Sequence, residues 1–121
     1  MIAAVFLAGS LGAVLRYLVD GAVQDRWDGA FPLGTFAVNM TGAFLLGTLT
    51  GFLVAHPSSP PALRVVAGVG FFGAYTTFST LMFESFRLLR EGAWSIALIN
   101  TVGGTAFGMA VAALGLRLGG V

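Results

Sequence analysis

The sequence predicts an all-α membrane protein with four transmembrane helices, the third of which is broken. Of the 121 residues, 57% are hydrophobic and only 9% are charged, whereas a soluble domain carries about 25% charged residues. The charged residues leave four long uncharged intervals, at 2–15, 29–55, 65–83 and 92–116. The third interval contains a cluster of glycines and hydroxyl side chains that is not expected in a helix that faces lipid.

Each uncharged interval can supply one membrane-spanning helix, because a bilayer core of about 30 Å needs roughly 20 apolar residues. We place the spans at residues 2–23, 32–55, 62–89 and 94–116, in a single domain over residues 1–121. Pro32 suits the first position of a helix. The first span is interpreted as a retained helix, since no basic residue follows Met1 as a signal peptide would require.

The third span is too long for one straight transmembrane helix, so we expect a break near residues 73–77. Three glycines, Gly68, Gly70 and Gly73, come just before a run of four hydroxyls around one aromatic ring, at 76–80. Non-helical backbone at membrane depth must be buried in protein or line a wet cavity. A break would free carbonyl groups for a small cation and hydroxyl groups for an anion.

The arginines of the loops predict that the chain can insert in either orientation. One side of the membrane would carry Arg64 and Arg117, and the other would carry Arg26, Arg87 and Arg90. Orientation follows the difference between such counts, which is small here.

Glycine pairs at Gly47/Gly51 and Gly104/Gly108 have the spacing that lets transmembrane helices approach closely. Four short helices leave little room for a lined pathway, so we also expect self-association.

The composition argues against an enzyme and against nucleic-acid binding. The chain has no cysteine and a single histidine, His56, so no second such ligand can complete a metal site, and no serine and aspartate are placed within reach of His56 for a Ser-His-Asp site. Its net charge of +1 gives no electrostatic footprint for nucleic acid.

Asn39 is the first candidate for function, because intramembrane polar residues are functional candidates by default. Its amide offers two donor hydrogens suited to an anion. The alternative is an interhelical hydrogen bond worth about 1 kcal/mol.

The hydroxyl run is the second candidate. Thr76, Thr77, Ser79 and Thr80 can bond back to carbonyls one turn earlier, but four within five residues favour a purpose-built break. Phe78 has a positive ring edge that can stabilise an anion without a formal charge. Such weak contacts allow the release that conduction requires.

Two charged residues have open roles. Arg16 either snorkels to the interface or supplies positive potential at an aqueous vestibule. Glu84 either pairs with Arg87 three residues later or is buried and hydrogen-bonded beside an anion path.

Three segments resemble the Fluc (CrcB) family of bacterial fluoride channels. They are Gly-Ala-Val-Leu-Arg-Tyr at 12–17, Gly-Thr-Phe-Ala-Val-Asn-Met-Thr-Gly at 34–42, and Gly-Ala-Tyr-Thr-Thr-Phe-Ser-Thr at 73–80. The segments occur in the family's order, and the likeness covers essentially the whole chain.

The resemblance implies an antiparallel, dual-topology dimer with two fluoride pathways, in the bacterial plasma (inner) membrane. It further implies a structural sodium ion at the dimer centre, held by the backbone carbonyls of Gly73 and Thr76. Asn39 would be the pore amide, Phe78 a fluoride-lining ring and Arg16 a vestibule residue. The full set of expected anion-pathway residues is Asn39, Phe78, Ser79, Thr80, Glu84 and Thr105.

The chain departs from the family pattern at two places. The family usually has a second phenylalanine where this chain has Leu81, and its fourth span tends to carry a tyrosine and serines. Asn100, Thr101 or Thr105 would have to substitute for those residues. These departures leave a heterodimer of non-identical subunits open, although a homodimer is favoured.

The expected function is passive export of fluoride, with membrane lipid around the protein. A small dimeric drug/proton antiporter is one alternative, but it needs a carboxylate deep in the first span, and residues 2–15 have none. A non-transporting membrane assembly subunit is the other.

Overall fold

The computed structural model describes all residues 1–121 and is entirely helical. Four helical stretches are long and apolar enough to cross a membrane, as predicted. The first two are α1 (Ile2–Gln24) and α2 (Leu33–Ala55). The third consists of α3 (Pro61–Leu63), the π-helix η1 (Arg64–Phe72), α4 (Gly73–Tyr75) and α5 (Phe78–Arg90). The fourth consists of α6 (Trp94–Leu98), the π-helix η2 (Ile99–Gly103) and α7 (Gly104–Gly119).

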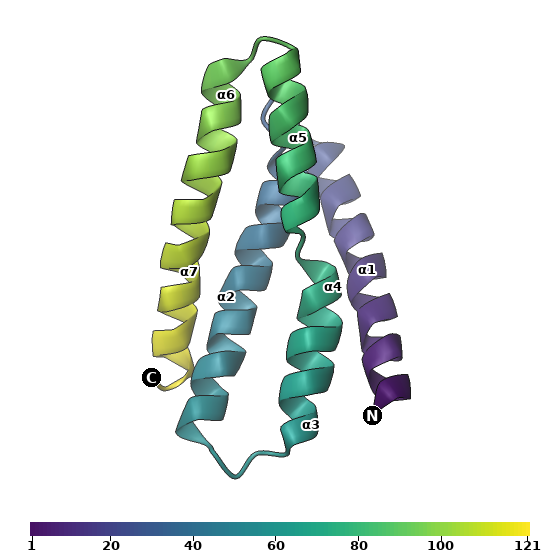
Figure 1. Ribbon diagram of the computed structural model, residues 1–121, viewed down its shortest axis with the longest axis vertical. Helices are drawn as coiled ribbons and strands as arrows, with labels where there is room; N and C mark the ends of the chain where they lie inside the picture. The colour runs from purple at the N-terminus through teal and green to yellow at the C-terminus, as the bar shows by residue number, and fades with distance from the viewer.

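The four spans alternate in direction, so both chain ends lie at the same end of the molecule. Figure 1 shows the N-terminus, the C-terminus and the α2–α3 loop together at one end, and the α5–α6 turn at the other. The short loops between consecutive spans require this up-and-down course. The loop arginines are therefore divided between the two ends as the sequence predicts.

Glycines allow α2 and α7 to pack backbone against backbone. A Cβ at Gly47 would overlap the carbonyl oxygen of Ala112, and one at Gly51 would overlap that of Leu116. On the facing helix, Gly115 and Gly119 meet α2 in the same way. The expectation for Gly47 and Gly51 is confirmed.

Gly104 and Gly108 make no such close approach within the chain. A Cβ at Gly108 would lie 3.4 Å from the Met40 side chain, and one at Gly104 would lie 3.9 Å from Leu81. These are contacts with side chains at ordinary distances. The close approach occurs about three turns further on, at Gly115 and Gly119, because α2 and α7 converge toward the C-terminal end.

The protein buries few apolar side chains and exposes many. The buried hydrophobic residues are Val38, Leu53, Tyr75, Leu81, Leu88 and Ala97. Large exposed hydrophobics cover every span, and Phe6, for example, is 72% exposed. A water-soluble protein of this size would reverse that ratio. Together with the four spans, this surface makes the chain a multi-pass membrane protein.

The third span is broken at Thr76 and Thr77. Both residues have extended backbone, with φ −83° and ψ 157° at Thr76 and φ −151° and ψ 116° at Thr77. The predicted interval of 73–77 contains the break, but Gly73 itself is helical, with φ −61° and ψ −37°. Gly68 and Gly70 lie within the π-helix, so neither of them ends the helical stretch.

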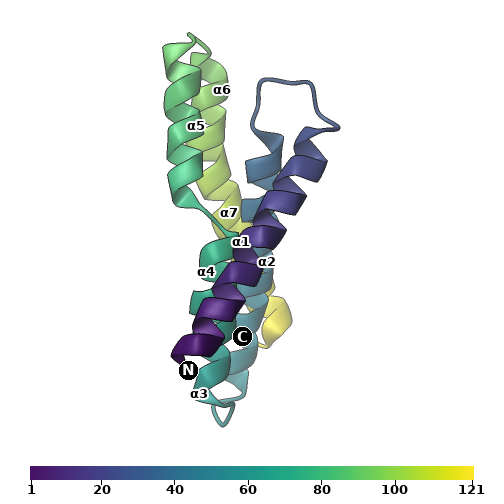
Figure 2. The same cartoon turned by 90° about the vertical axis from the view of Figure 1, so that its right-hand side faces the viewer.

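The break changes the course of the chain. Figure 2 shows α5 and α6 running together on one side, while α1 and the start of α2 lie on the other. The molecule therefore forks beyond the break, and the extended residues lie at the base of the fork.

Candidate functional site

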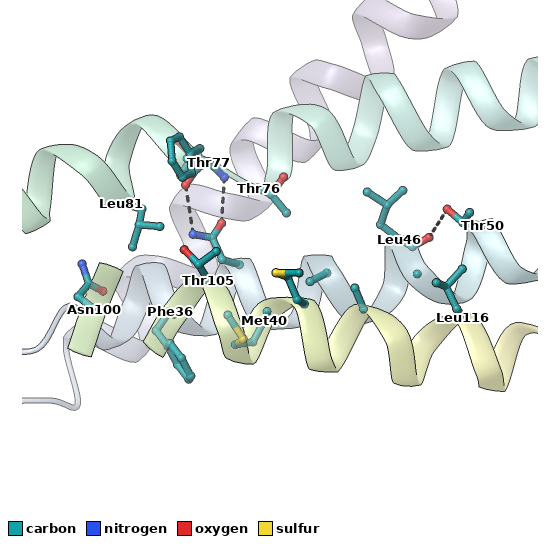
Figure 3. Close-up of a pocket in the computed structure, with 18 residues that line it drawn as sticks. Phe36, Met40, Leu46, Thr50, Thr76, Thr77, Leu81, Asn100, Thr105 and Leu116 are labelled. Atoms are coloured by element: carbon teal, nitrogen blue, oxygen red, sulfur yellow. Dashed lines mark hydrogen bonds between the residues drawn. The ribbon is translucent and has the colours of Figure 1, made fainter. Parts of the chain in front are cut away.

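An open cavity of about 540 Å³ lies beside the break, between α2, α5 and the fourth span. It collects Asn39, Phe78 and Thr105 from the predicted anion-pathway set. Thr76, Thr77, Leu81 and Asn100 also line it, and Figure 3 shows these side chains around it. Arg16, Ser79, Thr80 and Glu84 do not line this cavity.

Asn39 binds the backbone of the break through both ends of its carboxamide. Its Oδ1 accepts the Thr77 N–H at 2.9 Å, and its Nδ2 donates to the Thr77 carbonyl oxygen at 3.1 Å. Figure 3 shows the two bonds side by side beneath Thr77. The carboxamide has two donor hydrogens, so one N–H remains for the cavity.

The threonine hydroxyls of the run bond locally. Thr77 Oγ1 accepts the N–H of Thr80 at 3.2 Å and thereby caps the N-terminus of α5. Thr77 Oγ1 also donates to Thr80 Oγ1 at 3.2 Å, and Thr76 Oγ1 donates to the Phe72 carbonyl at 2.9 Å. These three threonines therefore shape the break, while the exposed Ser79 lies outside the cavity.

The same rearrangement diverts the helical donors of two carbonyl groups. In a continuous α-helix, the Thr77 N–H would bond to the Gly73 carbonyl and the Thr80 N–H to the Thr76 carbonyl. Here the Thr77 N–H goes to Asn39 and the Thr80 N–H goes to the Thr77 side chain. The two carbonyls expected to hold a cation are thus among those that lose their helical partners at the break, as the Ala74 and Tyr75 carbonyls at the end of α4 also do.

Phe78 is the first residue of α5; it is 67% exposed and lines the cavity. Leu81 lies one turn later on the same wall, and it is buried. The position at which the chain departs from the family pattern therefore faces the cavity with an aliphatic side chain.

Glu84 accepts a hydrogen bond from Thr35 Oγ1 of α2. Thr35 is only 4% exposed and Glu84 is half-buried, so this pair joins α2 to α5 in a partly buried setting. Of the two roles considered for Glu84, the structure shows the hydrogen-bonded one. Thr35 was not singled out from the sequence, although it precedes Asn39 by one helical turn and so shares its face.

Two of the three candidate substitutes in the fourth span line the cavity. Asn100 is 1% exposed and donates through Nδ2 to Ser85 Oγ at 2.9 Å. Thr105 Oγ1 donates its hydrogen to the Thr101 carbonyl at 2.7 Å, so its oxygen is left as a hydrogen-bond acceptor. Thr101 lies outside the cavity; its hydroxyl donates to the Ala97 carbonyl at 2.8 Å, and its oxygen lies 2.9 Å from Ser85 Oγ, from which it can accept.

Arg16 lies in α1, one turn beyond the contact of Gly12 with the Phe71 carbonyl. Its side chain is half-buried, and its Nε is buried without a hydrogen-bond partner. It is not part of the Asn39–Phe78 cavity.

The sequence matches a known family over nearly its whole length. A profile of the family described as "CrcB-like protein, Camphor Resistance (CrcB)" matches residues 3–116. The chain belongs to the CrcB family.

Several relatives align with most of this chain and over most of their own length. A protein named "Fluoride-specific ion channel FluC 1" from Leifsonia xyli subsp. xyli is 44% identical over 121 residues, covering 100% of this chain and 88% of the relative. One of the same name from Symbiobacterium thermophilum is 46% identical and covers 93% and 92% of the two chains. "Fluoride-specific ion channel FluC" from Maridesulfovibrio salexigens is 42% identical, covering 92% and 88%.

Membership of the CrcB family confirms the resemblance seen in the three segments. The relatives are bacterial and are named as ion channels, which agrees with four apolar spans and no enzyme. The chain is a multi-pass protein of the bacterial inner membrane.

Proposed function

We propose that the chain is a passive fluoride channel that exports cytoplasmic fluoride. The observation that carries this proposal is the cavity that joins Asn39 and Phe78 at the break of the third span. The names of relatives that align over nearly the whole chain support fluoride as the ion. Fluoride enters acidified cells as a neutral acid and is trapped as the anion, so a downhill leak is sufficient for export.

The anion pathway combines groups that attract an anion weakly. Asn39 supplies the N–H that Thr77 leaves unused, and Phe78 supplies its positive ring edge. Glu84 accepts the Thr35 hydrogen bond beside the path, and Thr105 lines the fourth-span wall. Ser79 and Thr80 follow Phe78 on α5, and Arg16 supplies positive potential at a vestibule. Weak, multiple contacts of this kind let an ion enter and leave.

The working unit is a dimer, with a second copy as the favoured partner. Phe78 is largely exposed and the polar lining of the cavity is open in a single chain. Neither irregular backbone nor unpaired amide groups can face lipid. An antiparallel second copy, inserted in the opposite orientation, would cover the break and leave two pathways.

A structural sodium ion fits the backbone of the break. The carbonyl oxygens of Gly73 and Thr76 are neutral oxygen ligands, which suit a hard cation, and both have lost their helical donors. When bound there, sodium would supply a fixed positive charge next to the fluoride pathways. Gly73 and Thr76 would hold it through main-chain atoms, and the Thr76 side chain would keep its hydrogen bond to the Phe72 carbonyl.

Fluoride efflux from proteoliposomes tests the channel. Purified chain is reconstituted with internal potassium fluoride, and release is followed with a fluoride electrode after addition of a potassium ionophore. We expect fast efflux that depends on the ionophore, because passive anion movement is electrogenic. An antiporter would instead need a proton gradient, and an assembly subunit would give no efflux. Efflux only after addition of a co-encoded relative would replace the homodimer with a heterodimer.

Asn39→Asp tests the pathway assignment. A carboxylate would place negative charge where the anion passes, so we expect loss of efflux. Size-exclusion chromatography should give the same dimer peak for the variant and the wild type. Normal efflux in the variant would remove Asn39 from the pathway.

A further inference from the structure

The structure shows an unusual partner for the break: a single side chain that bonds both backbone groups of one residue. Thr77 is extended, with φ −151° and ψ 116°. In this conformation the N–H and the C=O of a residue point to the same side, as they do in hydrogen-bonded pairs of antiparallel strands. The Asn39 carboxamide carries an acceptor and a donor with a matching separation, and it takes the place of the strand partner.

The carboxamide orientation follows from this pairing. Oδ1 faces the Thr77 N–H and Nδ2 faces the Thr77 carbonyl. If the amide were reversed, Nδ2 would face the Thr77 N–H, donor against donor, and Oδ1 would face the Thr77 carbonyl, acceptor against acceptor. The second hydrogen of Nδ2 therefore points out of the hydrogen-bonded ring, and Asn39 lines the cavity there.

Residues next to Asn39 reinforce the same contact. Thr41 Oγ1 and the Tyr75 hydroxyl lie 2.9 Å apart, and Tyr75 is 7% exposed. A Cβ at Gly42 would overlap the Thr76 methyl group. One turn of α2 thus holds three consecutive residues of the third span, 75–77.

We infer that Asn39 is a positioning residue as well as a pathway residue. The two hydrogen bonds from its carboxamide to the Thr77 backbone, called the clasp from here on, fix the break and set the start of α5 at Phe78. They also direct the remaining N–H of Nδ2 into the cavity. The role of that N–H toward an anion rests on the proposed function. The clasp itself is a property of the fold and is measurable without fluoride.

Amide hydrogen exchange at Thr77 tests the clasp. The full chain, labelled with ¹⁵N-threonine and ¹³C-threonine, is studied by NMR in micelles, with the amide of Thr50 in α2 as an internal reference. In the wild type we expect Thr77 to exchange as slowly as this helical amide. In Asn39→Ala both bonds are lost, and the exchange of Thr77 relative to Thr50 should rise about tenfold or more.

Asn39→Asp separates the two bonds and keeps the side-chain shape. Its carboxylate still accepts the Thr77 N–H, so exchange should rise less than in Asn39→Ala. The Thr77 carbonyl loses its donor, so its ¹³C resonance should move from the wild-type position. This variant also serves if Asn39→Ala does not fold.

Asn100→Ala is the matched control, since it removes the other asparagine, whose amide donates to Ser85. It should leave the Thr77 signals unchanged. The inference is overturned if Thr77 exchanges rapidly in the wild type. It is also overturned if the relative exchange and the carbonyl resonance of Thr77 are unchanged in both Asn39 variants. If the wild type gives no fluoride efflux, the proposed function is overturned, but the clasp is unaffected.

Discussion

Phe78 offers the sharpest test of a single side chain, because α5 contains a matched control. Phe78 and Phe83 are each 67% exposed, but only Phe78 lines the cavity. Replacing Phe78 with isoleucine removes the positive ring edge and keeps an apolar side chain. We expect slower fluoride efflux from Phe78→Ile proteoliposomes and wild-type efflux from Phe83→Ile. Equal efflux from the two variants would show that Phe78 only packs.

Thr35→Val tests the partly buried Thr35–Glu84 pair at the residue scale. Valine has a similar volume but leaves Glu84 without its Thr35 donor, which costs about 1–3 kcal/mol. We expect a lower thermal unfolding midpoint in detergent, and slower efflux because α5 loses a tie to α2. Thr50→Val is the control, since that exposed hydroxyl donates only to the Leu46 carbonyl of its own helix. Equal midpoints for the two variants would contradict the role of the pair.

At the scale of elements, the contact between α2 and α7 depends on glycine. Gly115→Ala would force its methyl group into the Phe44 carbonyl and the backbone of Thr48, and overpacking of this kind costs about 1–3 kcal/mol. We expect a clearly lower thermal unfolding midpoint for this variant. Gly104→Ala is the control, because its nearest neighbour would be a Leu81 side-chain carbon at 3.9 Å. If Gly104→Ala destabilises the protein more, the assignment of the packing glycines is wrong.

At the scale of the whole molecule, the balance of loop arginines predicts mixed orientation. One end carries Arg64 and Arg117, and the other carries Arg26, Arg87 and Arg90. Reporters fused to the C-terminus, one active in the cytoplasm and one in the periplasm, should both give signal for the wild type. Replacing Arg64 and Arg117 with glutamine leaves basic residues near the loops of one end only, so one reporter should fall silent. A wild-type chain with one orientation would contradict the antiparallel dimer.

The sequence carries most of the fold but only part of the site, and particular residues show why. Hydropathy alone defines the four spans, because length and apolarity are local properties. Gly104/Gly108 and Gly115/Gly119 have the same spacing, and only the relative height of α2 and α7 decides which pair makes the contact. The clasp of Asn39 joins residues 38 positions apart and depends on the extended backbone of Thr77. Thr35 could have been found, since it lies one turn from Asn39 on the same face.

The clasp has a consequence for the order of events during biosynthesis. The N–H and C=O of Thr77 would each cost several kcal/mol if they entered lipid without partners. Asn39 precedes Thr77 in the chain, so α2 has already left the ribosome when the third span emerges. We therefore expect the third span to enter the bilayer as a continuous helix and to open at Thr76–Thr77 only as it docks on α2. A chain from which α2 has been deleted should then integrate the third span as an unbroken helix.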